Sequence, residues 1–137
     1  MIQTLIDTDI LSLFFRNNDN VVQKFKDYIT KFKKINISII TYYEILSGLK
    51  HRDAKKQLIM FEDFAKLNTI VPLTEESIKI SSDIYSNLRK VGKPIDDIDI
   101  LIAGVAIFND FILVTNNEEH FKVIDNLIIE NWSKKIF

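Results

Sequence analysis

The sequence predicts a parallel α/β fold organised as a single domain, residues 1–137. Short apolar, β-branched runs alternate with segments whose apolar residues recur at helical spacing, as in strands joined by crossover helices. The strand-like runs lack a regular polar alternation, which is typical of strands buried on both faces. With 47% hydrophobic residues, three Gly and two Pro, the chain can form a core and has no linker-like segment.

The elements follow from these patterns in chain order. The expected strands cover residues 1–6, 35–40, 69–73, 111–115 and 127–129. The expected helices follow the first strand, cover 21–32, begin at Thr41, cover 53–65, extend from a Thr74 cap to Gly92, and extend from Asp96 to about residue 106.

A carboxylate ends the first expected strand, in the stretch Leu5-Ile6-Asp7-Thr8-Asp9. Ligand sites of open parallel sheets lie beyond the carboxyl ends of the strands, so Asp7 is expected at such a site. Thr8 and Asp9 have a structural alternative, because either could be the N-cap of the next helix. Asp7 comes one residue too early for that cap, and packing gives no other reason for it.

The second strand leads into Thr41-Tyr42-Tyr43-Glu44. Thr41 followed three residues later by Glu44 matches a capping box, which is a structural reason for Glu44. The same junction lies at the carboxyl edge of the sheet, where Asp7 is also expected. Capping and metal binding therefore both remain open for Glu44.

Three acids in four residues open the last long helix: Asp96, Asp97 and Asp99. Negative charge at a helix N-terminus is favourable by itself, and Asp96 is a good N-cap. These acids nevertheless repel one another on an otherwise apolar helix unless a cation lies between them. Asp96 and Asp99 are three residues apart and lean to one face, so we expect Asp99, with Asp96 beside it, to take part in a metal site.

Composition excludes several classes of chemistry. The absence of Cys removes disulfides, thiolate catalysis and zinc–thiolate sites. No signal peptide is evident, and the run from Ile98 to Val114 is interrupted by polar residues, so a cytoplasmic protein without a membrane span is expected. The net charge of −1 does not indicate nucleic acid, although residues 21–56 hold nine basic residues against three acids. This basic segment could hold a polyanion, or could simply be helix surface.

The expected acids come from three distant segments and meet at one edge of the sheet. Asp7, Glu44 and Asp99 form this set, with Asp96 and Glu119 as outer candidates. An all-oxygen cluster suits Mg²⁺, with Mn²⁺ as the alternative. Such an ion can polarise a phosphoryl oxygen and lower the pKa of a bound water, so a phosphodiester is the expected substrate.

Four motifs together resemble the PIN-domain family, most closely its VapC-like toxins. They are Leu5–Leu11, Ile39–Gly48, Pro94–Ala103 and Leu113–Phe121. The resemblance implies a three-layer α/β/α sandwich with a central, mostly parallel sheet. It also implies a Mg²⁺-dependent endoribonuclease that acts as the toxin of a toxin–antitoxin pair, a homodimer, an RNA substrate and a small antitoxin protein that blocks the site.

Position by position, Asp7 and Asp99 resemble the principal metal ligands of the family, and Glu44 resembles its third acid. Thr8 and Thr115 resemble polar neighbours of the site. The family often has a fourth acid after this Thr, whereas this chain has Asn116 and Asn117. An amide oxygen such as that of Asn117 can hold a metal or its water without charge, and Asp96 could compensate for the missing acid.

The same residues allow other interpretations of fold and function. Asp7-Thr8-Asp9 also resembles the start of a haloacid-dehalogenase-type phosphatase, but Leu11 stands where that motif requires Thr or Val. A receiver domain would need an acidic end to the strand before Thr74, which has none. A non-enzymatic PIN-like binding or assembly module is the alternative function. His51 and His120 are expected on the surface, Trp132 in the core, and Tyr42 or Tyr43 beside the substrate groove.

Overall fold

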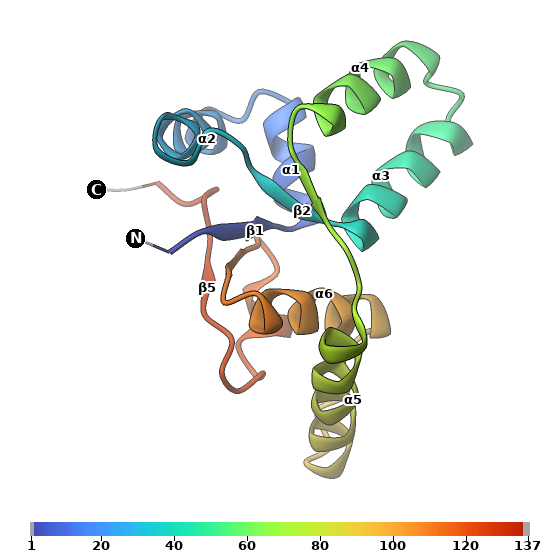
Figure 1. Cartoon of the computed structure of the whole chain (residues 1–137), viewed down its shortest axis with the longest axis vertical. Coiled ribbons are helices and arrows are strands. Elements are labelled where there is room, and N and C mark those ends of the chain that lie inside the picture. The colour runs from blue at the N-terminus through green and yellow to red at the C-terminus, as the bar shows by residue number, and fades with distance from the viewer. Residues whose placement is uncertain (1, 136–137) are drawn as a thin grey trace.

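A computed structural model describes residues 2–135 of the chain. Figure 1 shows short strands at the centre, with helices packed on two opposite sides. The strands are β1 (Thr4–Ile6), β2 (Asn36–Ser38), β3 (Thr69–Val71), β4 (Ile112–Val114) and β5 (Ile129–Glu130). The helices are α1 (Thr8–Phe15), α2 (Asp19–Phe32), α3 (Ile39–His51), α4 (Lys55–Lys66), α5 (Glu75–Lys90), α6 (Asp97–Phe108) and α7 (Glu118–Phe121).

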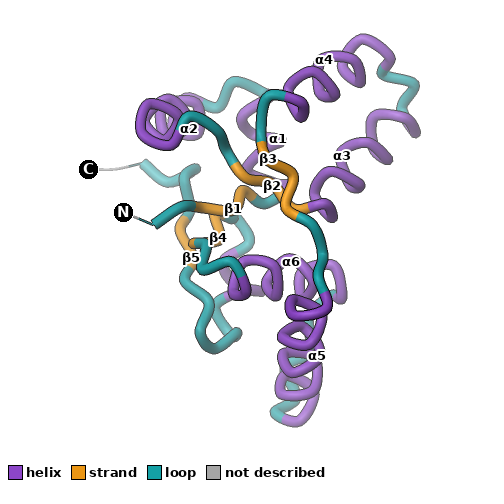
Figure 2. Tube along the Cα trace, in the orientation of Figure 1, coloured by secondary structure: helices purple, strands orange, loops and turns teal. Residues whose placement is uncertain are grey.

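The strands form two parallel ladders that lie side by side. One ladder has the order β1-β4-β5 and the other pairs β2 with β3, and β2 lies next to β1 (Figure 2). Asn36 bridges the two ladders, because its side-chain amide donates to the Thr4 carbonyl oxygen at 2.9 Å and to Gln3 Oε1 at 3.2 Å. The Asn36 side chain thus joins β2 to β1, which no backbone ladder connects. All the strand pairs are parallel, so the predicted parallel α/β architecture is confirmed.

Alternation along the central strands produces two cores, one on each side. Leu5 and Leu113 face one core, whereas Ile6 and Val114 face the other. Residues of α5 and α6 complete the first core, and residues of α1, α2, α3 and α4 complete the second. All four strand residues are fully buried, as expected for strands covered on both faces. The molecule is therefore three-layered.

The second strand is shorter than the sequence pattern predicts. It ends at Ser38, and Ile39 already belongs to α3. The Ser38 hydroxyl accepts the Thr41 backbone N–H at 3.0 Å, so Ser38 is the N-cap. The predicted capping box of Thr41 with Glu44 is wrong, because a buried apolar run does not distinguish the end of a strand from the start of a helix.

The third strand and the helix after it are predicted more accurately. Thr74 caps α5 through a capping box with Ser77, and Gly92 follows the helix with a φ of 72°, as expected for a C′ residue. Helices α5 and α6 then pack in close contact. A Cβ on Gly104 of α6 would overlap the Ser81 hydroxyl and lie 2.6 Å from the Ser77 carbonyl oxygen, so only Gly permits this approach.

The apolar run from Ile98 to Val114 is divided in the structure. It contains most of α6 and the whole of β4, separated by a turn in which Asp110 has a φ of 57°. Within residues 2–135, the structure contains no helix with the length and apolar character needed to cross a bilayer.

Candidate active site

Asp7 lies where β1 ends and α1 begins. Its backbone N–H continues the ladder by donating to the Val114 carbonyl oxygen at 2.9 Å, and its own carbonyl accepts the Leu11 N–H. Asp7 is therefore the N-cap of α1, in an extended conformation, which corrects the prediction that Thr8 or Asp9 holds this position. The strand ends at Ile6, as predicted, but the helix begins at least one residue earlier than a cap at Thr8 or Asp9 would place it.

The Asp7 carboxyl group is buried, and each of its oxygens accepts a hydrogen bond. Only 6% of the residue is exposed. Oδ1 accepts the Thr8 N–H at 2.8 Å, and Oδ2 accepts the Thr115 hydroxyl at 2.7 Å. Burial, followed by the nearby charge of Asp9, raises the pKa of Asp7 to about 7, although these hydrogen bonds oppose the shift. Within the described residues no ion pair with a cationic side chain offsets this shift.

Asp9 also belongs to the site, although its position in the sequence had favoured a role as an N-cap. Burial raises its pKa, and the charge of Asp99 raises it further. Its carboxylate accepts the Asn116 backbone N–H at 3.1 Å, at the end of β4. The spacing Asp7-x-Asp9 at a helix N-terminus was the available signal, because both residues lie at the end of the helix that faces the crevice.

Asn116 occupies the position where the family often has an acid, and the structure gives it another role. Its side-chain oxygen accepts the Asn131 amide at 3.0 Å and the Ser133 hydroxyl at 2.9 Å, which ties the loop after β4 to the segment after β5. Its backbone N–H remains directed at Asp9. The residue positions the loop through its amide.

Asp99, in the first turn of α6, faces the same site from the other helical layer. The charge of Asp99 contributes to the raised pKa values of both Asp7 and Asp9. Its Oδ2 lies 2.9 Å from Nδ1 of His120, which is also 2.8 Å from the side-chain amide of Asn117. A protonated Nδ1 would donate to the Asp99 carboxylate, whereas an unprotonated Nδ1 would accept from the Asn117 amide, so one tautomer serves one of these contacts. His120 is on the surface, as predicted, yet it contacts a predicted metal ligand.

Glu44 joins this site through Thr8. The Thr8 hydroxyl lies 2.7 Å from Glu44 Oε1 and 3.0 Å from the buried Thr41 hydroxyl. Thr8 is next to Asp7 in sequence, and its backbone N–H binds that carboxylate. Thr8 and Glu44, which were predicted separately as site residues, are thus in direct contact, and Thr8 adjoins Asp7.

Several other candidates form no hydrogen bond or ion pair with Asp7, Asp9 or Asp99 within the described residues. Asp96 is exposed at the N-cap position of α6, and its side chain caps no backbone N–H. Glu119 is exposed and pairs with Lys122 at 2.7 Å. Tyr42 packs against Phe61 with ring centroids 5.7 Å apart, whereas Tyr43 is 63% exposed. Trp132 is buried, as predicted.

The donor chemistry of the site fits a hard cation. Carboxylates from three segments lie together with hydroxyl and amide oxygens, and no Lys or Arg of residues 2–135 forms an ion pair with Asp7, Asp9 or Asp99. In the described chain, however, no three Asp, Glu or His side chains are placed to hold one ion as they stand. Asp99 is in contact with His120, and Glu44 accepts a hydrogen bond from Thr8. These side chains must therefore move before they can bind one ion together.

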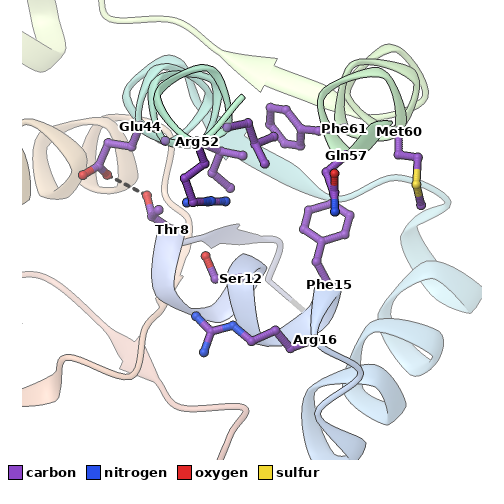
Figure 3. A pocket seen from close by; sticks show the side chains of 12 residues that line it. Thr8, Ser12, Phe15, Arg16, Glu44, Arg52, Gln57, Met60 and Phe61 are labelled. Carbon is purple, nitrogen blue, oxygen red and sulfur yellow. Dashed lines mark hydrogen bonds between the residues drawn. The ribbon is translucent and has the colours of Figure 1, made fainter. Parts of the chain in front are cut away.

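A cleft of about 400 Å³ opens beside the acids, between α1, α3 and α4 (Figure 3). Thr8 and Glu44 line the end next to Asp7, and they are joined by the hydrogen bond drawn in the figure. Apolar side chains from α3 and α4 form much of the remaining wall, including Ile45, Leu49 and Phe61. Among the acids of the site, Glu44 is the one that lines this cleft; Asp7, Asp9 and Asp99 are not part of its wall.

Comparisons with known proteins agree with this arrangement. The family model described as PIN domain matches residues 4–127. "Ribonuclease VapC1" of Methanocaldococcus jannaschii is 32% identical over 130 residues, covering 95% of this chain and 87% of that protein. "tRNA(fMet)-specific endonuclease VapC" of Shigella flexneri is 26% identical over 134 residues, covering 97% of this chain and 100% of that protein.

Solved structures show the same fold. The crystal structure of VapBC2 from Rickettsia felis, bound to a DNA fragment from its promoter, contains a chain that matches with a TM-score of 0.86 and 28% identity. The match covers 96% of this chain and 99% of that one. The chain belongs to the PIN-domain family and is similar, over nearly its whole length, to the VapC ribonucleases.

Proposed function

We propose that this protein is a Mg²⁺-dependent endoribonuclease and the toxin of a toxin–antitoxin pair. The observation that carries the proposal is the buried Asp7 carboxyl group, with Asp9 and Asp99 close enough for their charges to raise its pKa. Such a cluster of acids costs stability without a counterion and is typical of functional sites. Family membership and relatives named ribonuclease support RNA as the substrate.

In this proposal Asp7, Asp99 and Glu44 hold the metal ion, Mg²⁺ or alternatively Mn²⁺. When bound, the ion supplies a polarised phosphoryl oxygen and a water of lowered pKa. Thr115 and Thr8 orient Asp7 through the two hydrogen bonds that fix its carboxylate. Asn117 positions Thr115, because its backbone N–H donates to the Thr115 hydroxyl at 3.0 Å. Asp96 stays an outer candidate at the solvent edge.

The partners are proposed on the same basis. Two matched structures are VapBC complexes bound to DNA, from Rickettsia felis and Salmonella typhimurium, which supports a cognate antitoxin for this chain. A homodimer is proposed from the family resemblance. PIN-family membership leaves no support for the haloacid-dehalogenase or receiver-domain interpretations.

The decisive experiment compares Asp99→Asn with Asp97→Asn on labelled RNA, transfer RNA included, with and without Mg²⁺. Both acids lie in the first turn of α6, but Asp97 is exposed and its side chain forms no hydrogen bond or ion pair with residues 2–135, so it is a matched control. We expect Asp99→Asn to lose about 100-fold or more of the cleavage rate, and Asp97→Asn to stay near the native rate. Full activity of Asp99→Asn would contradict the ligand assignment.

If the native chain itself cleaves no RNA with either metal, the binding or assembly module becomes the better interpretation. The toxin role is tested separately by expressing the native chain with and without the small protein encoded beside it. Growth arrest that requires Asp99 and is relieved by that protein is expected. Normal growth with abundant native protein and no partner would contradict the toxin role.

A further inference from the structure

The chain has fifteen lysines but only three arginines, and two of the three line the same cleft. Arg16 follows α1 as its C-cap residue, and Arg52 follows α3 in the same position. The third, Arg89, lies on α5 and stacks over the Tyr85 ring, 4.4 Å from its centroid. Arginine presents a planar fork of donors that matches a phosphate, so its concentration in one cleft points to an anionic ligand.

Two stripes of residues line the cleft, one on α1 that leads from Thr8 to Arg16 and one on α3 that leads from Glu44 to Arg52. On α1, Thr8, Ser12 and Arg16 are spaced four residues apart, and on α3, Glu44, Gly48 and Arg52 have the same spacing. Residues four apart lie on one helix face, so each stripe leads from the acid end of the cleft to an arginine. Eight residues correspond to about 12 Å along a helix axis.

Arg52 shortens this distance by folding back along α3. A Cβ placed on Gly48 would lie 3.4 Å from Arg52 Nη1, so the guanidinium rests beside Gly48, one turn closer to Glu44. Figure 3 shows the guanidinium groups of Arg16 and Arg52 on either side of Ser12, both beside the cleft. The absence of a side chain on Gly48 leaves room for this position.

Both arginines are exposed, and within the part of the chain that the structure describes neither forms an ion pair or a side-chain hydrogen bond. Two cations that line one cleft without acidic partners make it electropositive, and an anion bound there would be attracted to both. Phe15 and Met60 add exposed apolar surface to the same cleft. Cations combined with an aromatic surface are the features by which proteins hold single-stranded nucleic acid.

We infer that the cleft between α1, α3 and α4 holds the RNA strand next to the scissile bond, with Arg16 and Arg52 binding a neighbouring backbone phosphate. The inference rests on the proposed ribonuclease function and assigns its substrate path. The active site, which adjoins the Thr8 and Glu44 end of the cleft, acts on one phosphodiester, while the arginines fix the register of the strand. The two arginines are substrate-positioning residues.

The test measures binding of a fluorescent single-stranded RNA oligonucleotide by anisotropy, in EDTA to prevent cleavage, across a series of KCl concentrations. Arg16→Gln, Arg52→Gln and the double variant are compared with Arg89→Gln, which removes the same charge on α5. We expect roughly tenfold weaker binding for the double variant. The slope of log affinity against log salt should fall by about 0.7 per arginine removed. Arg89→Gln should leave both quantities unchanged.

Arg→Lys variants keep the positive charge but lack the planar guanidinium. They should keep the native salt slope and recover only part of the affinity that the Gln variants lose. With Mg²⁺ present, the double variant should raise KM more than it lowers kcat. Native affinity and native salt slope in the double variant would overturn the inference while leaving the ribonuclease intact. Native RNA binding combined with lost association with the antitoxin would assign the arginines to a protein partner, which also overturns it. A native chain that neither binds nor cleaves RNA would contradict the proposed function itself.

Discussion

The two helical layers are packed in opposite ways. Helices α5 and α6 approach so closely that Gly104 touches Ser77 and Ser81, and the Ser81 hydroxyl donates to the Ile100 carbonyl oxygen at 3.0 Å. Helices α1, α3 and α4 instead leave a cleft of about 400 Å³ between them. Asp99 lies in the first turn of the closely packed α6, whereas Glu44 lines the cleft of the open group. Close packing and a solvent-filled cleft are thus divided between the two layers.

Replacing Gly104 by Ala should break the close layer and have the largest effect. The new Cβ would meet the Ser77 carbonyl oxygen, so the two helices must separate. We expect a loss of about 3 kcal/mol or more in the free energy of unfolding, measured with denaturant. Gly48→Ala is the matched control in the open layer, where the nearest atom is 3.4 Å away. It should be neutral or slightly stabilising, and an equal loss in both variants would contradict the comparison.

Replacing Asp7 by Asn should stabilise the metal-free protein at alkaline pH. The pKa of Asp7 is raised in the folded state from 3.8 to about 7, so the folded chain holds this proton more tightly than the unfolded chain. Stability therefore falls as the pH rises from about 4 through 7, and the cost is complete above 7. Three pKa units correspond to roughly 4 kcal/mol of destabilisation by the charged carboxylate, which the substitution removes. The substitution also removes one hydrogen bond, which costs about 1 kcal/mol and reduces the net gain.

We accordingly expect Asp7→Asn to be more stable than the native chain by roughly 2–3 kcal/mol at pH 8 in EDTA, and to lose this advantage near pH 4. Thermal unfolding across pH measures this difference. Glu76→Gln, in the exposed first turn of α5, is the control and should show no comparable pH trend. A stability difference independent of pH would show that Asp7 is not charged at the expected cost.

Mg²⁺ should stabilise the native chain by linkage. An ion that binds only the folded state at ten times its Kd adds about 1.4 kcal/mol, or several degrees in Tm. Titration with MgCl₂ at constant ionic strength measures the shift, and Asp7→Asn should lose most of it. A native Tm that does not respond to millimolar Mg²⁺ would argue against a specific ion at the acids.

The smallest effect is expected at the N-terminus of α5. Thr74→Ala removes the hydroxyl that accepts the Ser77 N–H at 3.0 Å, which should cost about 1 kcal/mol in the free energy of unfolding. Nuclease activity should stay near native, because this cap belongs to the close layer and holds no ligand. A Thr8→Val variant should show the reverse, with activity lost more than stability, since Thr8 binds Glu44 at 2.7 Å. If Thr74→Ala and Thr8→Val changed stability and activity in the same proportion, the start of α1 would have no functional role that the start of α5 lacks.

The junctions after β1 and β2 show where sequence reasoning fails by a residue or more. In both places a buried apolar run leads directly into a helix, so periodicity carries no boundary. Asp7 and Ser38 are the actual N-caps, although the patterns favoured Thr8 or Asp9, and Thr41. Short helices are missed for a related reason: α7 has four residues, too few for a period to be recognised.

The acidic set was predicted because strand ends and helix starts are local features, and parallel pairing brings them to one edge. Asp7 and Asp99 meet there, and Glu44 joins them through Thr8. His120 was correctly expected on the surface, but its contact with Asp99 joins residues 21 positions apart and has no local signature. The metal ligand roles themselves stay predictions.

Local sequence alone determined the alternation of strands and helices, the buried character of the strands, the Thr74 cap and the presence of acids at the carboxyl edge. These depend on hydrophobic period and cap chemistry within a few residues of one another. Only the tertiary structure decided that Asp9 joins the cluster, that His120 holds Asp99, and that Arg16 and Arg52 share one cleft. Such meetings depend on how two helix faces pack across the fold, and that geometry is set by the core as a whole.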